Sequence, residues 1–413
     1  MVSEVLRTDI PNDWNVITLG DYAQIFRGGS PRPIQAFLTT SDQGINWIKI
    51  GDVGAGEKFI EITEEKIIPE GVSRSRMVYK GDLILSNSMS YGRPYIMNIE
   101  GCIHDGWLVI QKYDRLFNRE YLYYALSSDL TMRQYVAMAA GSSVQNLNKE
   151  KVSKVVLPCP KISEQKKIAE VLSSIDALIV DLQKLIRKKK DIRQGTMQML
   201  VTGKKRLDGF DGEWVKINLS KNSKLKARIG WQGLTTAEYL DEGYSYLITG
   251  TDFKDGQINW NGCHYVDYNR YEQDPNIQVS NGDLLLTKDG TIGKVAYVAD
   301  LTRPATLNSG VFLVKPITDA YTAHFMFYVL ESSVFKDFLQ QLSAGSTINH
   351  LYQKDLVKFD LYVPPTKEEQ EAIAAILFDM DSDIHKLEAK LEKYQKVKQG
   401  MMEELLTGKV RLV

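Results

Sequence analysis

The residues best suited to chemistry in this 413-residue chain lie in short loops that combine arginine with glycine and hydroxyl side chains. The first of these loops is Arg27-Gly28-Gly29-Ser30-Pro31-Arg32. Guanidinium groups donate hydrogen bonds in a fork that matches guanine edges and phosphates, and glycine permits close approach of the backbone. The loop is therefore a candidate contact for a nucleic acid, although an ordinary surface turn explains it equally well.

Two more loops of the first half have the same character. Ser73-Arg74-Ser75-Arg76 alternates hydroxyl and guanidinium groups, and residues 87–93 directly follow a predicted strand. Loops on a rigid scaffold carry binding residues more often than the elements that they connect. The candidate nucleic-acid-contacting residues of the first half are Arg27, Ser30, Arg32, Arg74, Arg76, Asn87, Ser88, Tyr91 and Arg93.

The second half has loops at matching positions, built from different residues. They are Arg228-Ile229-Gly230-Trp231-Gln232-Gly233, followed by Thr235, and Lys288-Asp289-Gly290-Thr291-Ile292-Gly293-Lys294. Long polar side chains can bond base edges or phosphates. The candidates of this half are Arg228, Gln232, Thr235, Lys288 and Lys294. Trp231 can wedge or stack between bases, but a buried tryptophan is the favoured interpretation.

Two further signals have ordinary explanations. The Gly-Ser turns, with Gln145 and Asn146 or Asn349 and His350, either face DNA or cap the preceding helix. The basic run 187–190 lies in a segment with about twelve Lys and Arg against about five Asp and Glu. It resembles a phosphate-binding run, but a solvated helix face is the favoured interpretation.

No residue pattern predicts catalysis or metal binding. The five histidines are scattered without ligand spacing, and Cys263-His264 is too adjacent to form a metal pair alone. The sequence also lacks the Gly-rich cofactor loop and the Asn-Pro-Pro-aromatic or Asp-Pro-Pro-Tyr tetrad of an adenine methyltransferase. His104-Asp105, and Asp283 with Lys288, are interpreted as structural, because Gly-Asp-Leu enters a strand in both halves.

The composition is that of a soluble globular protein, with 43% hydrophobic and 25% charged residues. A net charge of −1 means that any binding of nucleic acid depends on local patches. Three cysteines without paired spacing fit a reducing cytoplasm. No uncharged apolar run approaches the roughly 20 residues that span a bilayer, so we expect a cytoplasmic protein without membrane contact.

The elements that must position these loops belong to an internal repeat of the sequence. The first half closes with Thr202-Gly203-Lys204-Lys205-Arg206-Leu207 and the second with Thr407-Gly408-Lys409-Val410-Arg411-Leu412. An offset of about 205 residues holds from Gln165 and Gln370 onward, and it slips by a few residues earlier in each half. A shared framework with unlike loops suggests one scaffold that reads two different things.

Each half ends in a long amphipathic segment. Apolar residues recur at steps of three and four after Pro160 and after Pro365, with Ser163 and Thr366 as the expected N-caps. The first stripe is Ile168, Val171, Leu172, Ile175, Leu178, Ile179, Leu182, Leu185, Ile186 and Ile192, and the second is Ile373, Ile376, Leu377, Met380, Ile384, Leu387, Leu391, Tyr394, Val397, Met401 and Leu405. Helices of about 38 residues, roughly 55 Å long, cannot bury such stripes alone. We expect the two to pair antiparallel, with pseudo-twofold symmetry between the halves.

Strands are expected at residues 45–50, 81–86 and 107–111, echoed at 244–248, 282–287 and 311–314. One helix should follow in each half, over 119–140 and 322–343. The predicted fold class is therefore α/β (mixed α+β), with two tandem domains joined by two long antiparallel coiled-coil helices.

The duplicated order of variable domain, Gly-Ser-(Ser/Thr) turn, Pro then Glu-Gln, heptad helix and Thr-Gly-Lys-x-Arg-Leu tail resembles the specificity subunits of type I restriction-modification enzymes. The resemblance covers essentially the whole chain. It implies a first target-recognition domain at 1–160, a central helical spacer at 161–207, a second target-recognition domain at 208–364 and a distal helical spacer at 365–413.

In that family each variable domain reads one half of an asymmetric, bipartite site in double-stranded DNA, and the helices set the gap. The resemblance implies two adenine-N6 methyltransferase subunits and restriction/translocase subunits as partners. S-adenosylmethionine, ATP and magnesium are then expected on those partners, with no cofactor and no catalytic centre on this chain. The alternatives are a scaffold that positions partner proteins without reading DNA and a nuclease with an unrecognised site.

Overall fold

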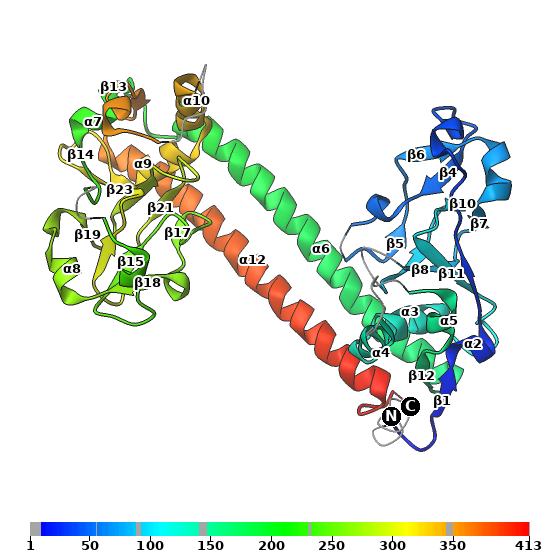
Figure 1. The fold of residues 1–413 in the computed structure, drawn as a ribbon. Helices are drawn as coiled ribbons and strands as arrows, with labels where there is room; N and C mark the ends of the chain where they lie inside the picture. Colours follow the sequence, from blue (N-terminus) through cyan, green and yellow to red (C-terminus); the bar gives the residue numbers. More distant parts are fainter. Residues whose placement is uncertain are drawn as a thin grey trace. The chain divides into compact units, whose positions relative to one another are not determined.

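The computed structural model describes residues 10–54, 56–87, 92–139, 147–229, 233–343 and 350–412. The chain divides into two compact units (Figure 1). Unit 1 consists of Met1–Gln183 and Ala389–Val413, and unit 2 of Lys184–Glu388. Each unit holds one globular domain together with parts of two long helices, α6 (Ile162–Val201) and α12 (Lys367–Thr407).

The globular domain of unit 1 contains two five-stranded sheets, with strand orders β2-β11-β8-β9-β5 and β3-β6-β4-β10-β7, and the antiparallel pair β1-β12. Its strands are β1 (Asn15–Thr18), β2 (Gln24–Arg27), β3 (Leu38–Thr39), β4 (Ile45–Ile48), β5 (Phe59–Ile60), β6 (Glu65–Ile67), β7 (Arg76–Val78), β8 (Leu83–Ser86), β9 (Pro94–Met97), β10 (Gly101–Ile103), β11 (Trp107–Gln111) and β12 (Val156–Cys159). Its short helices are α2 (Leu19–Tyr22), α3 (Arg119–Ser127), α4 (Asp129–Ala139) and α5 (Lys149–Ser153), with 3-10 turns η1 (Ile34–Ala36), η2 (Ile50–Asp52) and η3 (Pro69–Arg74).

Unit 2 repeats this plan with sheets β14-β23-β20-β21 and β18-β15-β22-β19 and the pairs β13-β24 and β16-β17. Its strands are β13 (Val215–Asn218), β14 (Ser223–Lys226), β15 (Ser245–Ile248), β16 (Phe253–Lys254), β17 (Gln257–Ile258), β18 (His264–Val266), β19 (Gln278–Val279), β20 (Leu284–Thr287), β21 (Val295–Tyr297), β22 (Ala305–Leu307), β23 (Val311–Pro316) and β24 (Asp360–Val363). Its short helices are α7 (Leu219–Asn222), α8 (Tyr268–Glu272), α9 (Ala323–Glu331), α10 (Ser333–Leu342) and α11 (Gln353–Leu356), with 3-10 turns η5 (Thr236–Glu238), η6 (Trp260–Gly262) and η7 (Pro275–Ile277). The mixed α+β fold and all six predicted strands are confirmed, with shifts of one or two residues at their ends.

The central sheet of each unit is buried on both faces. In unit 1, Leu83 and Leu85 pack toward α3 and α6, whereas Ile84 between them packs toward the other sheet. In unit 2, Leu284 and Leu286 face the helices and Leu285 faces the other sheet. Successive side chains of a strand point to opposite faces, so a fully apolar run joins two cores.

The single helix predicted after the central sheet is wrong in both halves. Ser128 separates α3 from α4, and Ser332 separates α9 from α10, each with an extended backbone conformation. Ser332 caps α10 by accepting a hydrogen bond from the backbone of Val334, and the hydroxyl of Ser128 also donates to the carbonyl of Ala125. A serine that bonds the local backbone competes with helix propagation, which the apolar pattern does not reveal.

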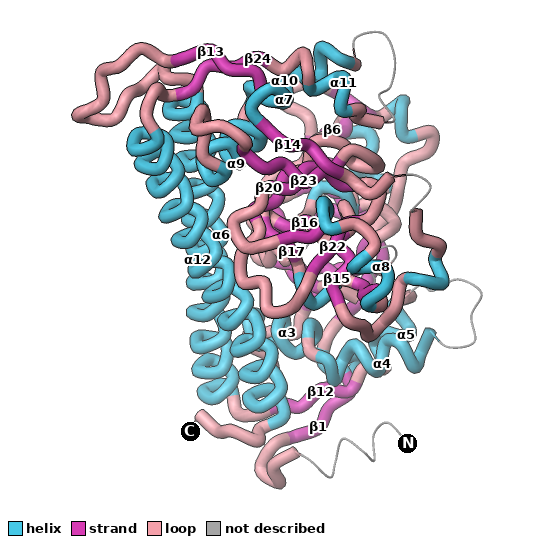
Figure 2. The backbone as a smooth tube through the Cα atoms, turned by 90° about the vertical axis from the view of Figure 1, so that its left-hand side faces the viewer, coloured by secondary structure: helices cyan, strands magenta, loops and turns pink. Residues whose placement is uncertain are grey.

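The long helices run antiparallel within each unit (Figures 1 and 2). In unit 1, the start of α6 around Leu172 packs with the end of α12 around Leu405, and in unit 2 Leu200 packs with Ile373. The expected antiparallel pairing is thus confirmed in both. The predicted stripe was too wide, because Leu178, Leu185, Ile192, Ile376 and Val397 are exposed beside the buried heptad positions.

Thr366 caps α12 as predicted, since its hydroxyl accepts a hydrogen bond from the backbone of Glu369. The N-cap prediction for Ser163 is wrong, because α6 begins one residue earlier, at Ile162.

The repeated tail motif fastens the end of one long helix to the start of the other. In unit 1, Arg411 forms a double hydrogen bond with Glu164, at 2.7 and 3.0 Å, and in unit 2 Arg206 forms one with Glu369, at 2.7 and 2.8 Å. The neighbouring glutamines Gln165 and Gln370 each bond two backbone carbonyls and one backbone N–H. Bidentate arginine–carboxylate pairs combine strength with fixed geometry, which explains why these positions repeat.

Candidate nucleic-acid interface

Asp105 organises the first arginine-rich loop. The hydroxyl of Ser30 donates to its carboxylate at 2.8 Å, and the guanidinium groups of Arg27 and Arg32 each approach it to 3.9 Å. The bond from Ser30 lowers the pKa of Asp105, with a further contribution from the charge of Arg27. Both arginine side chains remain more than half exposed, so they are oriented by one carboxylate and free to bond another molecule.

Gly28 allows the backbone of this loop to pack closely against the backbone at His104, in the connection between β10 and β11. A Cβ atom added there would lie 2.1 Å from the carbonyl oxygen of His104. The backbone N–H groups of Gly28 and Gly29 donate to the carbonyls of Trp107 and Ile103. No side chain fits at Gly28, which supports the predicted role of this glycine in close approach.

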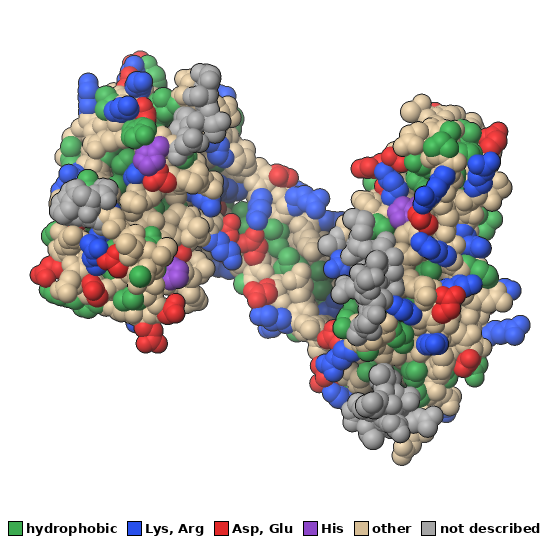
Figure 3. All heavy atoms as spheres, in the orientation of Figure 1, with side chains coloured by type: hydrophobic (Ala, Val, Ile, Leu, Met, Phe, Trp, Pro, Cys, Tyr) green, Lys and Arg blue, Asp and Glu red, His purple; other side chains and the backbone are tan. Residues whose placement is uncertain are grey.

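Two other candidates of the first half, Arg74 and Arg76, lie beside this loop. Arg76 donates to the carbonyl of Arg27 at 3.0 Å and lies over the ring of Phe26, whereas Arg74 is exposed beside the ring of Phe37. Arg93 is exposed at the end of the loop between β8 and β9. Ser88 and Tyr91 lie outside the described residues. Basic and acidic side chains gather around a histidine on the visible face of this unit (Figure 3).

The predicted role of Asn87 as a contact residue needs a correction. It is buried, and its amide donates to the carbonyl of Asp105 at 3.0 Å. Its own carbonyl accepts a hydrogen bond from Leu147. Asn87 therefore supports the loop of Asp105 from below instead of offering its amide to a ligand.

In unit 2, Lys288, Asp289 and His350 form a compact group. The Lys288 ammonium lies 3.2 Å from the Asp289 carboxylate and 3.2 Å from Nε2 of His350, and Nδ1 of His350 pairs with the other oxygen of Asp289. The Lys288 side chain is only 12% exposed and lies over the ring of Phe312. Lys288 is thus placed at the predicted loop, but it is held more tightly than the arginines of unit 1.

The predicted role of Arg228 as a contact residue also needs a correction, because its side chain is buried and the residue is only 3% exposed. Its guanidinium donates to the carbonyl of Leu307 at 2.9 Å and to the hydroxyl of Thr306 at 3.3 Å, and burial lowers its pKa. In strand register it takes the place that Gly28 has in unit 1. A side chain that braces β22 in this way cannot read a base edge.

Two of the remaining candidates of unit 2 lie at its surface. Lys294 is exposed at the end of the loop between β20 and β21. Thr235 caps η5, because its backbone N–H and its hydroxyl both bond Glu238 at 2.8 Å. Gln232 and Trp231 lie outside the described residues, as do Gln145, Asn146 and Asn349.

The loops of Asn87 and Lys288 are held by the same backbone bonds. Asn87 receives a bond from Leu147 and donates to Gly106, and Lys288 receives one from Leu351 and donates to Gly310. Ser86 and Thr287 each accept a hydrogen bond from the backbone at the far end of the loop, at Arg93 and Lys294. One loop framework is therefore built twice, with different side chains on it.

The basic run of α6 is partly used inside unit 2. Lys189 and Lys190 pair with Asp383 and Glu388 of α12, at 3.5 and 2.6 Å, whereas Arg187 and Lys188 are exposed. The hydrogen bond to Glu388 raises the pKa of Lys190. Ion pairing between the helices, in addition to solvation, therefore explains this run.

Sequence reasoning named Asp289 and His350 near candidate loops, but it did not pair Asp105 with Ser30 or His350 with Lys288. Asp105 is 75 residues from Ser30, and His350 is 62 residues from Lys288. The sequence offered only a weak signal for these clusters. A loop rich in arginine or lysine without a nearby acidic partner indicates that a carboxylate from elsewhere in the chain could pair with it. Within the described parts of the chain, no group of His, Cys, Asp and Glu has the arrangement of a metal site, and no helix is long and apolar enough to cross a membrane.

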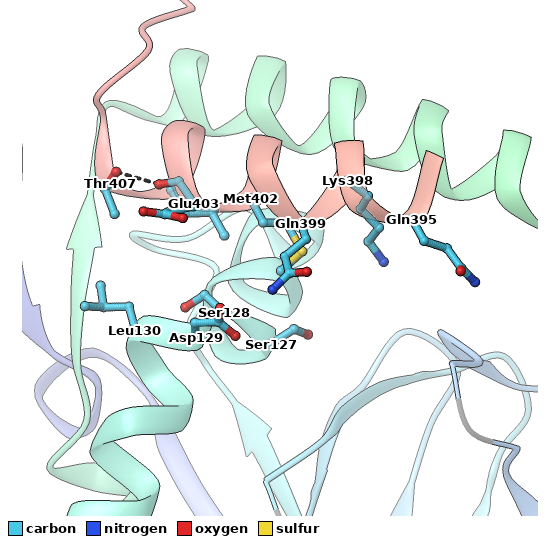
Figure 4. A pocket seen from close by; sticks show the side chains of 11 residues that line it. Ser127, Ser128, Asp129, Leu130, Gln395, Lys398, Gln399, Met402, Glu403 and Thr407 are labelled. Atoms are coloured by element: carbon cyan, nitrogen blue, oxygen red, sulfur yellow. Dashed lines mark hydrogen bonds between the residues drawn. The ribbon is translucent and has the colours of Figure 1, made fainter. Parts of the chain in front are cut away.

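Two of the hollows in unit 1 lie beside elements described above. One, of about 370 Å³, is lined by Ser30, Pro31, Arg32, Ile34, Trp47, Lys49 and His104 beside the Asp105 cluster. The other is a groove of about 280 Å³ between the α3–α4 junction and the end of α12. Figure 4 shows Ser127, Ser128 and Asp129 on one side of this groove and Gln399, Met402 and Glu403 on the other.

Comparison with known proteins agrees with this duplicated arrangement. The chain is 24% identical over 98% of its length to the type I restriction enzyme MjaVIII specificity subunit of Methanocaldococcus jannaschii, covering 94% of that protein. It is 26% identical to the putative type I restriction enzyme MjaX specificity subunit of the same organism, over 98% of this chain and 95% of the relative. The crystal structure of a type I restriction-modification system S subunit from M. genitalium has a similar fold, with a TM-score of 0.60, 16% identity and 96% of both chains covered.

A family model for the type I restriction modification DNA specificity domain matches the chain twice, over residues 11–194 and 204–395. Each match contains one globular domain and most of one long helix. Two matches account for most of the sequence and reproduce the internal repeat. The chain therefore belongs to the type I restriction modification DNA specificity domain family.

Proposed function

We propose that this chain gives a type I restriction-modification complex its DNA sequence specificity, and that each unit reads one half of an asymmetric, bipartite site. The observation that carries the proposal is the repeated loop framework with unlike side chains. The framework carries Asn87 in unit 1, which bonds Asp105 next to exposed arginines, and it carries Lys288 in unit 2, next to Asp289 and His350. Equal frameworks with different polar groups suit the reading of two different base sequences.

Partner subunits complete the proposal. We infer two adenine-N6 methyltransferase subunits and restriction/translocase subunits, with S-adenosylmethionine, ATP and magnesium bound by those partners and catalysis carried out there. A chain with net charge −1 has little electrostatic attraction for DNA as a whole. Phosphate contacts from partners, with base reading by this chain, divide affinity and sequence recognition between subunits.

Binding by the chain assembled with its methyltransferase subunits tests the proposal. Target sites are first located by mapping methylated adenines in a strain that carries the complete system. The complex should then bind a target duplex at least a thousandfold more tightly than a scrambled duplex at physiological salt. Equal affinity for both duplexes would instead favour a scaffold that positions partners without reading DNA.

Arg93 and Lys294 provide a matched pair for phosphate contact. They end the corresponding loops of the two units, and both are exposed. Arg93→Ala and Lys294→Ala should each weaken binding to all duplexes by a similar factor and reduce the slope of log affinity against log salt by about 1. An unchanged slope in both variants would show that these two residues do not contact the DNA.

Arg32→Ala should instead relax the base preference at one position of one half-site.

A further inference from the structure

The hollow beside the Asp105 cluster has carbon-rich walls. One lining residue is Trp47 of β4, which is 3% exposed and belongs to a small core with Ile67 and Cys102. Pro31 and Ile34 form the wall on the side of the arginine-rich loop. The opening therefore exposes a small apolar surface in the middle of a polar loop cluster.

The polar groups of the lining residues are almost all committed elsewhere. The hydroxyl of Ser30 bonds Asp105, and the ammonium of Lys49 pairs with Glu65 at 3.0 Å and Glu64 at 3.7 Å. The backbone N–H of Gly106 donates to Nδ1 of His104 at 2.6 Å, and Nε2 of the same ring lies 3.4 Å from the backbone nitrogen of Ile50. Arg32, 84% exposed at the rim, carries the most accessible charged group among these lining residues and can bond an incoming ligand.

These features select a small apolar group attached to a polar, anionic partner. In the major groove of DNA, the apolar group presented by the base pairs is the C5-methyl of thymine, and apolar side chains recognise it by contact. The hollow, of about 370 Å³, is larger than a methyl group and can also admit the adjoining ring edge. Arg32 at the rim is then placed to bond a neighbouring guanine or phosphate.

We propose that unit 1 recognises the C5-methyl group of a thymine with the hollow formed by Pro31, Ile34, Trp47 and His104. This inference rests on the proposed function, because it assumes that the Asp105 cluster faces DNA. It adds a determinant of specificity by shape, whereas the arginines act by hydrogen bonding. It also predicts that the half-site read by unit 1 contains thymine.

The test replaces each thymine of the target site in turn by uracil, which lacks only the methyl group, and measures affinity of the assembled complex. At one position in the half-site of unit 1, uracil should weaken binding about fourfold, the value of one buried methyl group. That half-site is identified as the one whose sequence changes when the first domain is exchanged. A half-site without thymine, or one in which no uracil substitution weakens binding, would overturn the proposal.

Two substitutions at Ile34 link the effect to the hollow. Ile34→Phe fills the space and should bring the thymine-to-uracil affinity ratio close to 1, whereas Ile34→Val should retain most of it. Ile62→Phe, at a position 77% exposed in the same domain, is the control for a new aromatic group. If Ile34→Phe leaves the ratio at about 4, the hollow is not the reader. If the unmodified complex does not distinguish target from scrambled duplex, the proposed function itself fails, which is a separate outcome.

Discussion

The junction between the short helices and the long helices is built differently in the two units. In unit 2, Arg193 of α6 bonds Glu331 at 2.6 Å and Asp381 at 2.8 Å, and Ser333 donates to Gln198 at 2.7 Å. In unit 1, the repeat counterparts are Lys398, Ser127, Asp176, Asp129 and Glu403. Lys398 pairs with Asp176, and no hydrogen bond or ion pair between described residues joins 127–130 to 395–407.

The substitutions remove from unit 1 the contacts that cross this junction in unit 2, and the groove of Figure 4 lies at that place. Ser127 has no charge to attract a cation from α12, and the carboxylates of Asp129 and Glu403 replace a hydroxyl–amide pair. Unit 1 is instead fastened by Lys58, which precedes β5 and bonds Glu120, the hydroxyl of Tyr124 and that of Ser173. A repeat can therefore keep a fold while the buried cation that stabilises it moves to another element.

Substitution of Arg193 should have the largest effect on the difference between the two junctions. The Arg193 side chain is only 15% exposed, and this burial alone would lower its pKa. The bonds to Asp381 and Glu331 outweigh that effect and raise the pKa. Arg193→Ala leaves the two carboxylates without their cation and should destabilise unit 2 by about 3–5 kcal/mol, because buried charges lose their partner. Hydrogen-exchange mass spectrometry should show faster exchange in residues 323–342.

Lys398→Ala is the matched variant in unit 1. Lys58 remains there to fasten α3 to its surroundings, so exchange in residues 119–139 should rise less than in the Arg193 variant. Equal losses in the two variants would show that the two junctions depend on the same contact after all.

The contact between the tail residue Arg411 and Glu164 predicts that the stability of unit 1 depends on pH. The hydrogen bond from Arg411 lowers the pKa of Glu164, and the indole of Trp14 also donates to that carboxylate. A lowered carboxyl pKa contributes stability that is complete above the ordinary value of 4.5 and is lost as pH falls through the folded-state value. Unit 1 should therefore loosen below pH 4.5, with a change in Trp14 fluorescence.

Glu164→Gln removes the titrating group and should remove this part of the pH dependence while lowering stability at neutral pH. The effect on stability should be smaller than that of Arg193→Ala, because Arg411 keeps its pair with Asp13. An unchanged acid transition in Glu164→Gln would assign it to other carboxyl groups.

The smallest effect concerns the groove itself. Asp129→Ser combined with Glu403→Gln introduces the residue pair of unit 2 and should stabilise unit 1 by about 0.5–1.5 kcal/mol, the net value of one hydrogen bond. The reverse exchange, Ser333→Asp with Gln198→Glu, should destabilise unit 2. A double-mutant cycle in each unit measures the coupling, and a coupling near zero in both would show that these pairs do not decide whether the groove is open.

Much of the fold was predictable because it depends on local periodicity. The apolar runs Leu83-Ile84-Leu85 and Leu284-Leu285-Leu286 predicted the central strands, and the heptad steps from Ile168 and Ile373 predicted the long helices. Periodicity along a strand or a helix depends only on neighbouring residues, so a single sequence is enough to reveal it.

The candidate site was predictable only in part. The loops of Arg27–Arg32 and Lys288–Lys294 were found because arginine, lysine and glycine are unusual together at the ends of strands. The burial of Arg228 was not predictable, because it depends on Thr306 and Leu307, which are 78 and 79 residues away in sequence. The break at Ser128 was missed for a different reason, since a serine within an apolar helical pattern can either continue the helix or end it.

The sequence by itself determined that this protein is built twice, with two sets of strands, two heptad helices and two tail motifs, because each of these is a local pattern repeated at a nearly constant offset. Only the tertiary structure decided which polar side chains are exposed to a ligand and which are used to hold the domain together. Asp105, Asp289 and Arg193 acquire their roles from partners that are distant in the chain, and the free energy of a charged group depends on the burial and the partners that folding provides.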